Sequence, residues 1–294
     1  MKIINQLDNQ ALLDLDDLCQ NCQQHDGSLI PIYKTILSEK RTMNCNTLLY
    51  EQEHLIGFLS PFFFYDDACE IALMVAPSHR KKGLASHLLK TILPLLHNKH
   101  MKHLIFSTSH NPHDAWLKNL GFNYKSSEYE MQRTLTFVHE INRTYPPTLT
   151  IRPATIEDIP DLSTIDQACF QSQRPDMHTR FENLLHRPNY QLFIIQLDGV
   201  TIGKAHLRLS TNQSHITDVA ILPTYQGKGY GSALLHYCIN YSLQNSINNI
   251  YLEVETSNSH ALNLYKRLGF TITNAYNFWS TPISNPWLSK IAQY

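Results

Sequence analysis

The sequence has little charge, no excess of either charge sign and no long apolar run. Charged residues make up 17% of the 294 residues, and the formal net charge is -1. An affinity that depends mainly on phosphate contacts needs a basic excess, so we expect no nucleic-acid partner. No apolar stretch approaches the roughly 20 residues of a transmembrane helix, and residues 1–10 lack the features of a Sec-type signal peptide. We therefore expect a cytoplasmic protein without membrane contact. Separately, we expect a monomer.

Cysteine is also scarce and shows no pairing pattern. The six cysteines are scattered, and a chain of this size does not need disulfides, so we expect reduced thiols. Cys19 and Cys22 form a CxxC motif, but no second pair of ligands follows at a spacing suited to zinc. We interpret the two cysteines as small residues near one face of a helix, and we predict no metal site.

What the sequence does contain is an internal repeat of about half its length. A set of positions recurs at constant spacing: Gly57, Pro77, Arg80, Gly83 and Ala85 correspond to Gly203, Pro223, Gln226, Gly229 and Gly231. A period this long indicates two copies of one domain and not a solenoid. Tyr145-Pro146-Pro147-Thr148 is a turn-rich stretch between the copies. We predict an N-terminal domain over residues 1–142, a linker over 143–150 and a C-terminal domain over 151–294.

The pattern within each copy predicts a mixed-sheet α/β domain. In the second copy, apolar residues 192–197 and 200–209 flank Asp198-Gly199, which is a strong hairpin signal. A strand over 215–222 then leads to a glycine-rich loop, a helix with apolar residues recurring over 234–241, a strand over 250–254 and a helix over 261–268. The first copy follows the same order, so we expect an α/β fold with a mixed sheet and flanking helices, present twice.

The most informative segment is the glycine-rich loop Gln226–Gly231, between a strand and a helix. Its three glycines allow several backbone N–H groups to converge on an anion, and the following helix adds the positive end of its dipole. A diphosphate is the natural ligand, although the loop alone leaves open a turn without a ligand. A Rossmann site does not fit, because it requires a different glycine spacing directly after the first strand.

The surrounding residues resemble the GNAT acetyltransferase superfamily. Residues 219–223 and the loop are similar to its acetyl-CoA motif, whose signature Arg/Gln-x-x-Gly-x-Gly/Ala is matched by Gln226, Gly229 and Gly231. A second signature, Asn-x-x-Ala-x-x-Leu-Tyr-x-x-x-Gly-Phe, is matched by Asn258, Ala261, Leu264, Tyr265 and Gly269-Phe270. The resemblance covers residues 151 to about 272. It implies tandem GNAT domains and an acetyl-CoA-dependent N-acetyltransferase.

The resemblance also implies which residues hold acetyl-CoA. Backbone amides of residues 227–232 would bind the diphosphate, and the strand at residues 219–221 would hydrogen-bond the pantetheine arm. Asn258 would contact the pantetheine or adenosine part, and Tyr265 would face the thioester sulfur. The predicted cofactor-binding residues are Val219, Ala220, Ile221, Gln226, Gly227, Lys228, Gly229, Tyr230, Gly231, Ser232 and Asn258.

Acetyl transfer from a thioester needs a neutral amine, stabilisation of an oxyanion and a proton for the departing thiolate. Tyr265 is the predicted acid, because a phenol pKa of about 10 is close to that of an alkyl thiol; simple packing of its ring is the alternative. His215 is the predicted base, at a position where the superfamily often has a glutamate. Asp218, Glu253 and Glu255 are rivals, and the amine could also lose its proton to solvent. A backbone N–H at residue 221 or 222 would stabilise the oxyanion.

The first copy keeps the loop and loses the chemistry. Arg80–Ala85 still satisfies the acetyl-CoA pattern, but Leu117 stands at the position of Tyr265, with Trp116 before it. We predict a catalytically degraded domain with a structural, regulatory or substrate-recruiting role, and leave open whether it binds acetyl-CoA.

Tandem chains of this type include mycothiol synthase and the VipF-type effectors that bacteria deliver into host cells, and the layout here is more similar to the effectors. The predicted acceptor is an amine of a protein, either a lysine or the N-terminus, and translocation into a host cell is an expectation of the same resemblance. The alternatives are a small-molecule amine acceptor, or a non-catalytic scaffold that binds acetyl-CoA.

Overall fold

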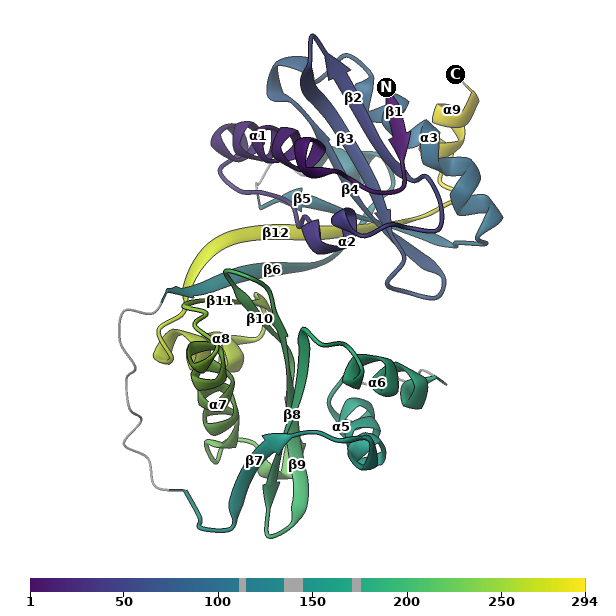
Figure 1. Ribbon diagram of the computed structural model, residues 1–294. Coiled ribbons are helices and arrows are strands. Elements are labelled where there is room, and N and C mark those ends of the chain that lie inside the picture. The colour runs from purple at the N-terminus through teal and green to yellow at the C-terminus, as the bar shows by residue number, and fades with distance from the viewer. Residues whose placement is uncertain (111–114, 135–144, 171–175, 294) are drawn as a thin grey trace. The chain divides into compact units, whose positions relative to one another are not determined.

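The computed structural model describes residues 1–110, 115–134, 145–170 and 176–293 (Figure 1). The chain forms two compact units. The first, here the N-lobe, comprises Met1–Tyr129, Glu255–Ser257 and Asn274–Tyr294; the second, here the C-lobe, comprises Glu130–Val254 and Asn258–Thr273. Each unit is therefore assembled from separate pieces of the sequence.

These units differ from the contiguous domains predicted at 1–142 and 151–294. Strand β6 (Asn123–Thr134) starts in the N-lobe and continues into the C-lobe, and β12 (Thr271–Pro282) does the reverse. The physical reason is strand pairing, because residues 276–282 of β12 pair antiparallel with β5 (His103–Ser109) of the N-lobe. The predicted end of the first domain at residue 142 and the first two linker residues lie outside the described residues.

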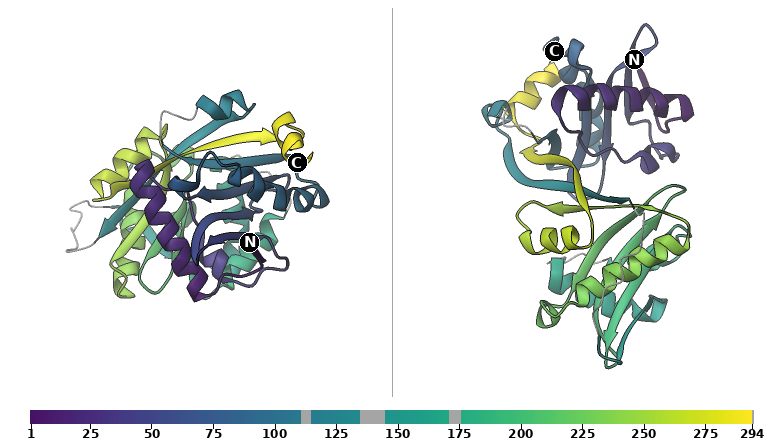
Figure 2. Two further views of the ribbon diagram at one scale, coloured as in Figure 1. Left: turned by 90° about the horizontal axis from the view of Figure 1, so that it is seen from above. Right: turned by 90° about the vertical axis from the view of Figure 1, so that its left-hand side faces the viewer.

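The N-lobe sheet has the strand order β1-β2-β3-β4-β5-β12. Its other strands are β1 (Lys2–Ile4), β2 (Asn46–Glu51), β3 (His54–Phe62) and β4 (Ala68–Val75). Its helices are α1 (Asn9–Asp26), α2 (Lys34–Ser38), α3 (Leu84–Asn98), α4 (Ala115–Asn119) and α9 (Pro286–Gln293). Alternate residues of the strands face opposite sides, so the lobe has one core under α1 and α2 and another under α3 and α9. Figures 1 and 2 show the C-terminal helix α9 beside α3.

The C-lobe sheet has the strand order β6-β11-β10-β9-β8-β7. Its other strands are β7 (Leu149–Pro153), β8 (Tyr190–Leu197), β9 (Val200–Leu209), β10 (Ser214–Ile221) and β11 (Asn249–Glu255). Its helices are α5 (Ile159–Phe170), α6 (Met177–Leu185), α7 (Tyr230–Gln244) and α8 (Ser259–Arg267). Strands β10 and β11 run parallel, whereas β7 to β10 pair antiparallel. The predicted α/β fold with a mixed sheet is confirmed.

Candidate active site

A β-bulge in β10 opens the C-lobe sheet at the carboxyl end of that strand. The register with β9 shifts between Thr217 and Ala220, and Asp218 adopts a positive φ of 50°. Gly203 of β9 lies opposite, where a Cβ would come within 2.5 Å of the Ala220 carbonyl. Pairing of β10 with β11 involves only the first two residues of β10, Ser214 and His215. The remainder of β10 therefore has one free edge.

The backbone beyond the bulge presents polar groups to this free edge. The N–H of Leu222 donates to the Ile202 carbonyl of β9 at 2.8 Å. N–H groups alternate in direction along a strand, so the N–H of Ile221 points away from β9, toward the free edge. Of the two predicted oxyanion donors, the geometry thus supports residue 221 and leaves the N–H of residue 222 engaged elsewhere.

A cavity of about 580 Å³ lies at this edge, between β10, the glycine loop and α8. Most of the predicted cofactor residues line it: Val219, Ile221, Gln226, Gly227, Gly229, Tyr230, Gly231, Ser232 and Asn258. Two do not, because Ala220 points into the core at 5% exposure and Lys228 lies outside the lining. Gly229 has a φ of 92° and α7 begins directly after it, so the unpaired N–H groups of the first helical turn are at the cavity.

Two basic residues of the lining, His260 and Arg267, were missed by the sequence reasoning. Their signal is helical spacing, because residues 260, 264 and 267 share one face of α8 and Leu264 belongs to the recognised signature. Asn258 has a local task as well, since its side-chain oxygen caps α8 by accepting from the N–H of Ala261 at 3.1 Å.

The first residue of the acetyl-CoA signature closes the loop in both lobes. In the C-lobe, the Gln226 side chain donates to the Ile221 carbonyl at 2.8 Å. In the N-lobe, Nε of Arg80 donates to the Val75 carbonyl at 3.0 Å. The two acceptors correspond by the repeat spacing, so this side chain fixes the turn and leaves ligand contacts to the backbone amides that follow.

Tyr265 lines the same cavity from α8 and is only 8% exposed. Its ring packs edge-on against Phe270, at a centroid distance of 6.1 Å. Burial raises the pKa of its phenol to about 12. The hydroxyl is therefore protonated at neutral pH, as a general acid must be.

His215 is not among the lining residues and belongs to a polar cluster on β9, β10 and β11. Its Nε2 is paired with the Glu253 carboxylate, and its ring stacks on Tyr251 at 4.2 Å. Its Nδ1 lies 3.4 Å from Nη2 of Arg208, which also donates to the Tyr251 hydroxyl at 3.1 Å. One neutral tautomer satisfies both contacts, with Nε2–H donating and Nδ1 accepting. Glu253 does not line the cavity either, but of the pair it keeps unused acceptor capacity.

Asp218, another rival base, is engaged in a buried ionic cluster. Its carboxylate lies 2.9 Å from Nδ1 of His206 and 3.7 Å from Arg180. Burial alone would raise the pKa of Asp218, but His206, Lys204 and Arg180 hold it below its usual range. A carboxylate stabilised in its charged form is a weak proton acceptor, so this geometry favours Glu253 over Asp218.

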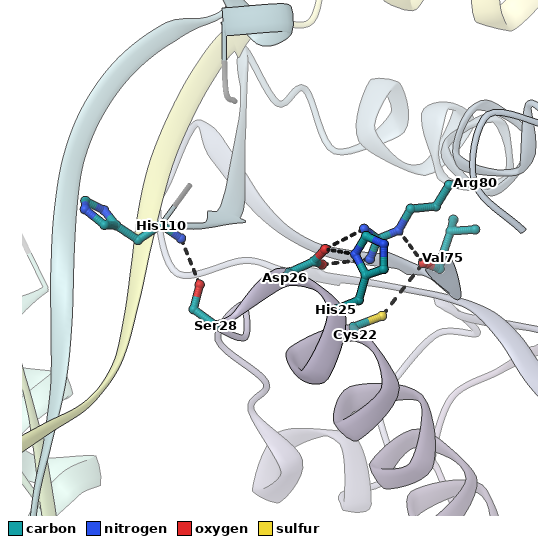
Figure 3. A network of polar contacts seen from close by, with 7 residues as sticks. All are labelled: Cys22, His25, Asp26, Ser28, Val75, Arg80 and His110. Carbon is teal, nitrogen blue, oxygen red and sulfur yellow. Dashed lines mark hydrogen bonds and ion pairs between the residues drawn. The ribbon is translucent and has the colours of Figure 1, made fainter. Parts of the chain in front are cut away.

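The N-lobe has its own cavity, of about 650 Å³, and its lining includes Cys22, Asp26, Val75 and Arg80, which Figure 3 labels. Arg80 forms two contacts of 2.7 Å with Asp26 at the end of α1, and the Cys22 thiol donates to the Val75 carbonyl at 3.7 Å (Figure 3). The catalytic positions carry different chemistry: by the repeat spacing, Cys69, Ser107 and Leu117 stand where the C-lobe has His215, Glu253 and Tyr265. Trp116 lines this cavity. None of these four side chains is a strong acid or base at neutral pH.

The bulged strand, the free strand edge and the glycine loop at a helix N-terminus, present in a duplicated mixed α/β chain, define the class of two-lobed acyltransferases. Residues 10–122 and 159–270 match the family described as the acetyltransferase (GNAT) family. The chain belongs to this family. It is therefore an acyltransferase of the N-acetyltransferase type.

Known relatives agree with the assignment. A putative ribosomal protein bS18-alanine N-acetyltransferase of Bacillus subtilis (strain 168) is 28% identical over 119 residues, covering 40% of this chain and 78% of the relative. The mycothiol acetyltransferase of Pseudarthrobacter chlorophenolicus is 23% identical over 296 residues, covering 90% of each chain. The crystal structure of a GCN5-related N-acetyltransferase from Sphaerobacter thermophilus superimposes with a TM-score of 0.76 at 15% identity, over 95% of each chain, which shows the same fold.

Among the described residues, none of the helices combines the length and apolar character that a bilayer crossing requires.

Proposed function

We propose that the C-lobe binds acetyl-CoA and transfers the acetyl group to an amine of a protein, at a lysine or the N-terminus. GNAT enzymes use acetyl-CoA, and the observation that carries the proposal here is that most of the predicted cofactor residues line one cavity of the C-lobe. The unpaired N–H groups after Gly229, together with Arg267 and His260, suit a diphosphate. The free edge of β10 suits the amide-bearing pantetheine arm.

The C-lobe residues divide the chemistry among them. Acetyl-CoA supplies the thioester carbonyl that the amine nitrogen attacks. Glu253, oriented by His215, accepts the proton that this nitrogen loses. The N–H of Ile221 donates to the carbonyl oxygen as negative charge develops on it. Tyr265 gives its proton to the sulfur as the C–S bond breaks, so the products are an amide and free CoA thiol.

A small-molecule amine is the second candidate acceptor. It is favoured by the mycothiol acetyltransferase relative, which is similar over 90% of this chain. The alanine N-acetyltransferase relative favours a protein N-terminus instead. Delivery into a host cell stays a prediction.

A matched pair of variants tests the proposed site. Gly229 and Gly83 both adopt a positive φ before the first turn of their helices, at 92° and 78°. Gly229→Glu should abolish thiol release from acetyl-CoA in the presence of peptides with a free N-terminus or a free lysine. Gly83→Glu should retain this turnover, because the N-lobe lacks the acid and base. Turnover in a folded Gly229→Glu variant would remove the C-lobe loop from the site.

A further inference from the structure

The β10 bulge carries an aspartate in a backbone conformation that favours glycine. The register shift places two residues of β10, Asp218 and Val219, opposite the single residue Ala205 of β9. Asp218 has a φ of 50°, and a bulge residue with this left-handed conformation is usually glycine. The conformation costs free energy in any residue that has a Cβ. Contacts of the Asp218 side chain can offset this cost.

The contacts of Asp218 are the end of a chain of buried polar groups that starts on α5. The Asp166 carboxylate of α5 lies 2.6 Å from Nζ of Lys204, and both side chains are buried. Nζ of Lys204 lies 3.1 Å from Nε2 of His206, and Nδ1 of His206 lies 2.9 Å from the Asp218 carboxylate. Arg180 of α6 is farther from that carboxylate, at 3.7 Å. His206 is therefore the nearest partner of the bulge residue.

This chain fixes which ring nitrogen of His206 carries the proton. Lys204 is paired with Asp166 as an ammonium ion, and an ammonium group only donates hydrogen bonds. Nε2 of His206 must therefore accept from Lys204. Burial, followed by the charge of Lys204, lowers the pKa of His206, so its ring is neutral at pH 7 and its one proton is on Nδ1. His206 consequently donates from Nδ1 to Asp218.

The N-lobe provides an internal comparison for this chain. By the repeat spacing, the three strand positions of the chain carry uncharged residues in the N-lobe, namely Phe58, Ser60 and Ala72. All three are buried, and Ser60 pairs directly with Ala72 in a β3–β4 register that runs without a shift from Gly57 to Phe62. The two lobes thus differ in the charged chain and in the bulge together. This agreement indicates that the chain holds the bulge.

We propose that His206, held in one tautomer by Lys204, is a positioning residue that keeps Asp218 in its left-handed conformation and so maintains the free edge of β10. The proposal rests on the proposed function and adds the groups that hold this edge in place. Val219 and Ile221 line the cavity directly beyond the bulge. Without the His206 contact, these two residues lose the orientation that the pantetheine arm and the oxyanion require.

A rescue experiment separates this role from simple packing. His206→Phe keeps a ring edge-on to Phe181 and removes the Nδ1 donor. Asp218→Gly supplies a residue that adopts a positive φ without side-chain contacts, whereas Asp218→Ala does not. The control Thr201→Val removes a buried hydroxyl of the same strand, which donates to a carboxylate of α5. The full-length variants are compared by their Kd for acetyl-CoA and by amide hydrogen exchange of residues 216–222 without acetyl-CoA.

We expect His206→Phe to weaken acetyl-CoA binding by about 5- to 30-fold, which corresponds to the cost of one left-handed residue with a Cβ. Exchange of residues 216–222 should accelerate in the same variant. Asp218→Ala should have both effects while leaving the buried part of the chain intact. Adding Asp218→Gly to His206→Phe should recover most of the affinity and of the slow exchange, because glycine needs no support at this position. Thr201→Val should change neither measurement.

Normal acetyl-CoA affinity and normal exchange in His206→Phe would overturn the proposal. So would a loss that Asp218→Gly does not recover, because His206 would then act through packing alone. If His206→Phe does not fold, equal affinities of Asp218→Ala and Asp218→Gly would overturn it instead. If the natural sequence does not bind acetyl-CoA, the proposed function fails, whereas the exchange rates still decide whether His206 holds the bulge.

Discussion

Tyr265 illustrates how burial suits a side chain to the role of general acid that we propose for it. Tyr265 lines the cavity, its ring packs edge-on against Phe270, and its phenol stays protonated because burial raises its pKa to about 12. Tyr265→Phe removes only the hydroxyl, so the packing of α8 should change little. If the hydroxyl protonates the departing thiolate, kcat should fall by roughly 10- to 10³-fold, or about 1.4–4 kcal/mol of barrier. The Kd for acetyl-CoA should change much less.

The measurement for Tyr265→Phe is kcat beside an independent Kd for acetyl-CoA. A normal kcat would move the proton donor to another group, such as a bound water. Much weaker acetyl-CoA binding with normal turnover of the bound form would make Tyr265 a packing residue.

Glu70 of the N-lobe is a buried acid that makes stability depend on pH. It is 4% exposed and accepts a hydrogen bond from the Tyr33 hydroxyl at 2.8 Å. Burial, partly offset by Tyr33, raises its pKa from 4.5 to about 7. Between these two pH values the folded lobe binds more protons than the unfolded chain, so its stability should fall as pH rises, by up to roughly 3 kcal/mol.

Glu70→Gln should remove this pH dependence, because glutamine does not ionise. The check is amide hydrogen exchange in β4 between about pH 4.5 and pH 8, compared with the exposed control Glu53→Gln. A slope that persists in Glu70→Gln would assign the dependence to another group.

At the scale of elements, the β10 bulge distinguishes the two lobes. The β3–β4 pairing of the N-lobe continues from Glu70 to Val75 without a register shift, whereas β10 is bulged opposite Gly203. A Cβ on Gly203 would meet the Ala220 backbone carbonyl at 2.5 Å, whereas a Cβ on Gly57 would meet a flexible leucine side chain at 3.0 Å. A backbone carbonyl cannot move aside as easily as the end of a flexible side chain can.

Gly203→Ala should therefore displace residues 219–221 and weaken acetyl-CoA binding by at least about tenfold, which corresponds to 1.4 kcal/mol. Gly57→Ala is the matched control and should leave that affinity unchanged. Acetyl-CoA titrations of both variants provide the check, and equal affinities would show that the bulge does not depend on a glycine in β9.

The features that the sequence could predict are those that depend on residues adjacent in the chain. The Asp198-Gly199 turn has positive φ at both residues, 50° and 79°, as its hairpin motif requires. The glycine loop and the start of α7 likewise depend on adjacent residues. The bulge at Asp218 and the pairing of His215 with Glu253 depend on which strands become neighbours, and a one-residue change of register reverses the faces. Neither could be derived from spacing along a single strand.

At the scale of the molecule, the repeat in the sequence shows that there are two copies of the domain. It does not show which copy's sheet the last strand of each copy, β6 or β12, pairs with. Strands β6 and β12 occupy equivalent places in the repeat, so their sequence patterns do not distinguish pairing within a copy from exchange between copies. In the structure, β12 after Thr273 and all of α9 belong to the N-lobe. The last residues of the chain should therefore stabilise its first domain.

A single core residue of α9 tests this exchange. Leu288 is 1% exposed and packs in the N-lobe core with α3 residues such as Leu93 and Leu96. Leu288→Ala should destabilise the N-lobe by about 2–5 kcal/mol, the usual range for a buried leucine. Hydrogen exchange should accelerate in β4, β5 and α3, whereas exchange in β8 and β9 and the Kd for acetyl-CoA should stay unchanged. The matched variant Leu235→Ala, in the buried face of α7, should accelerate exchange in the C-lobe instead. Faster exchange in β8 and β9 of Leu288→Ala would contradict this assignment. Helix α9 would then stabilise the C-lobe, as the prediction of two contiguous domains requires.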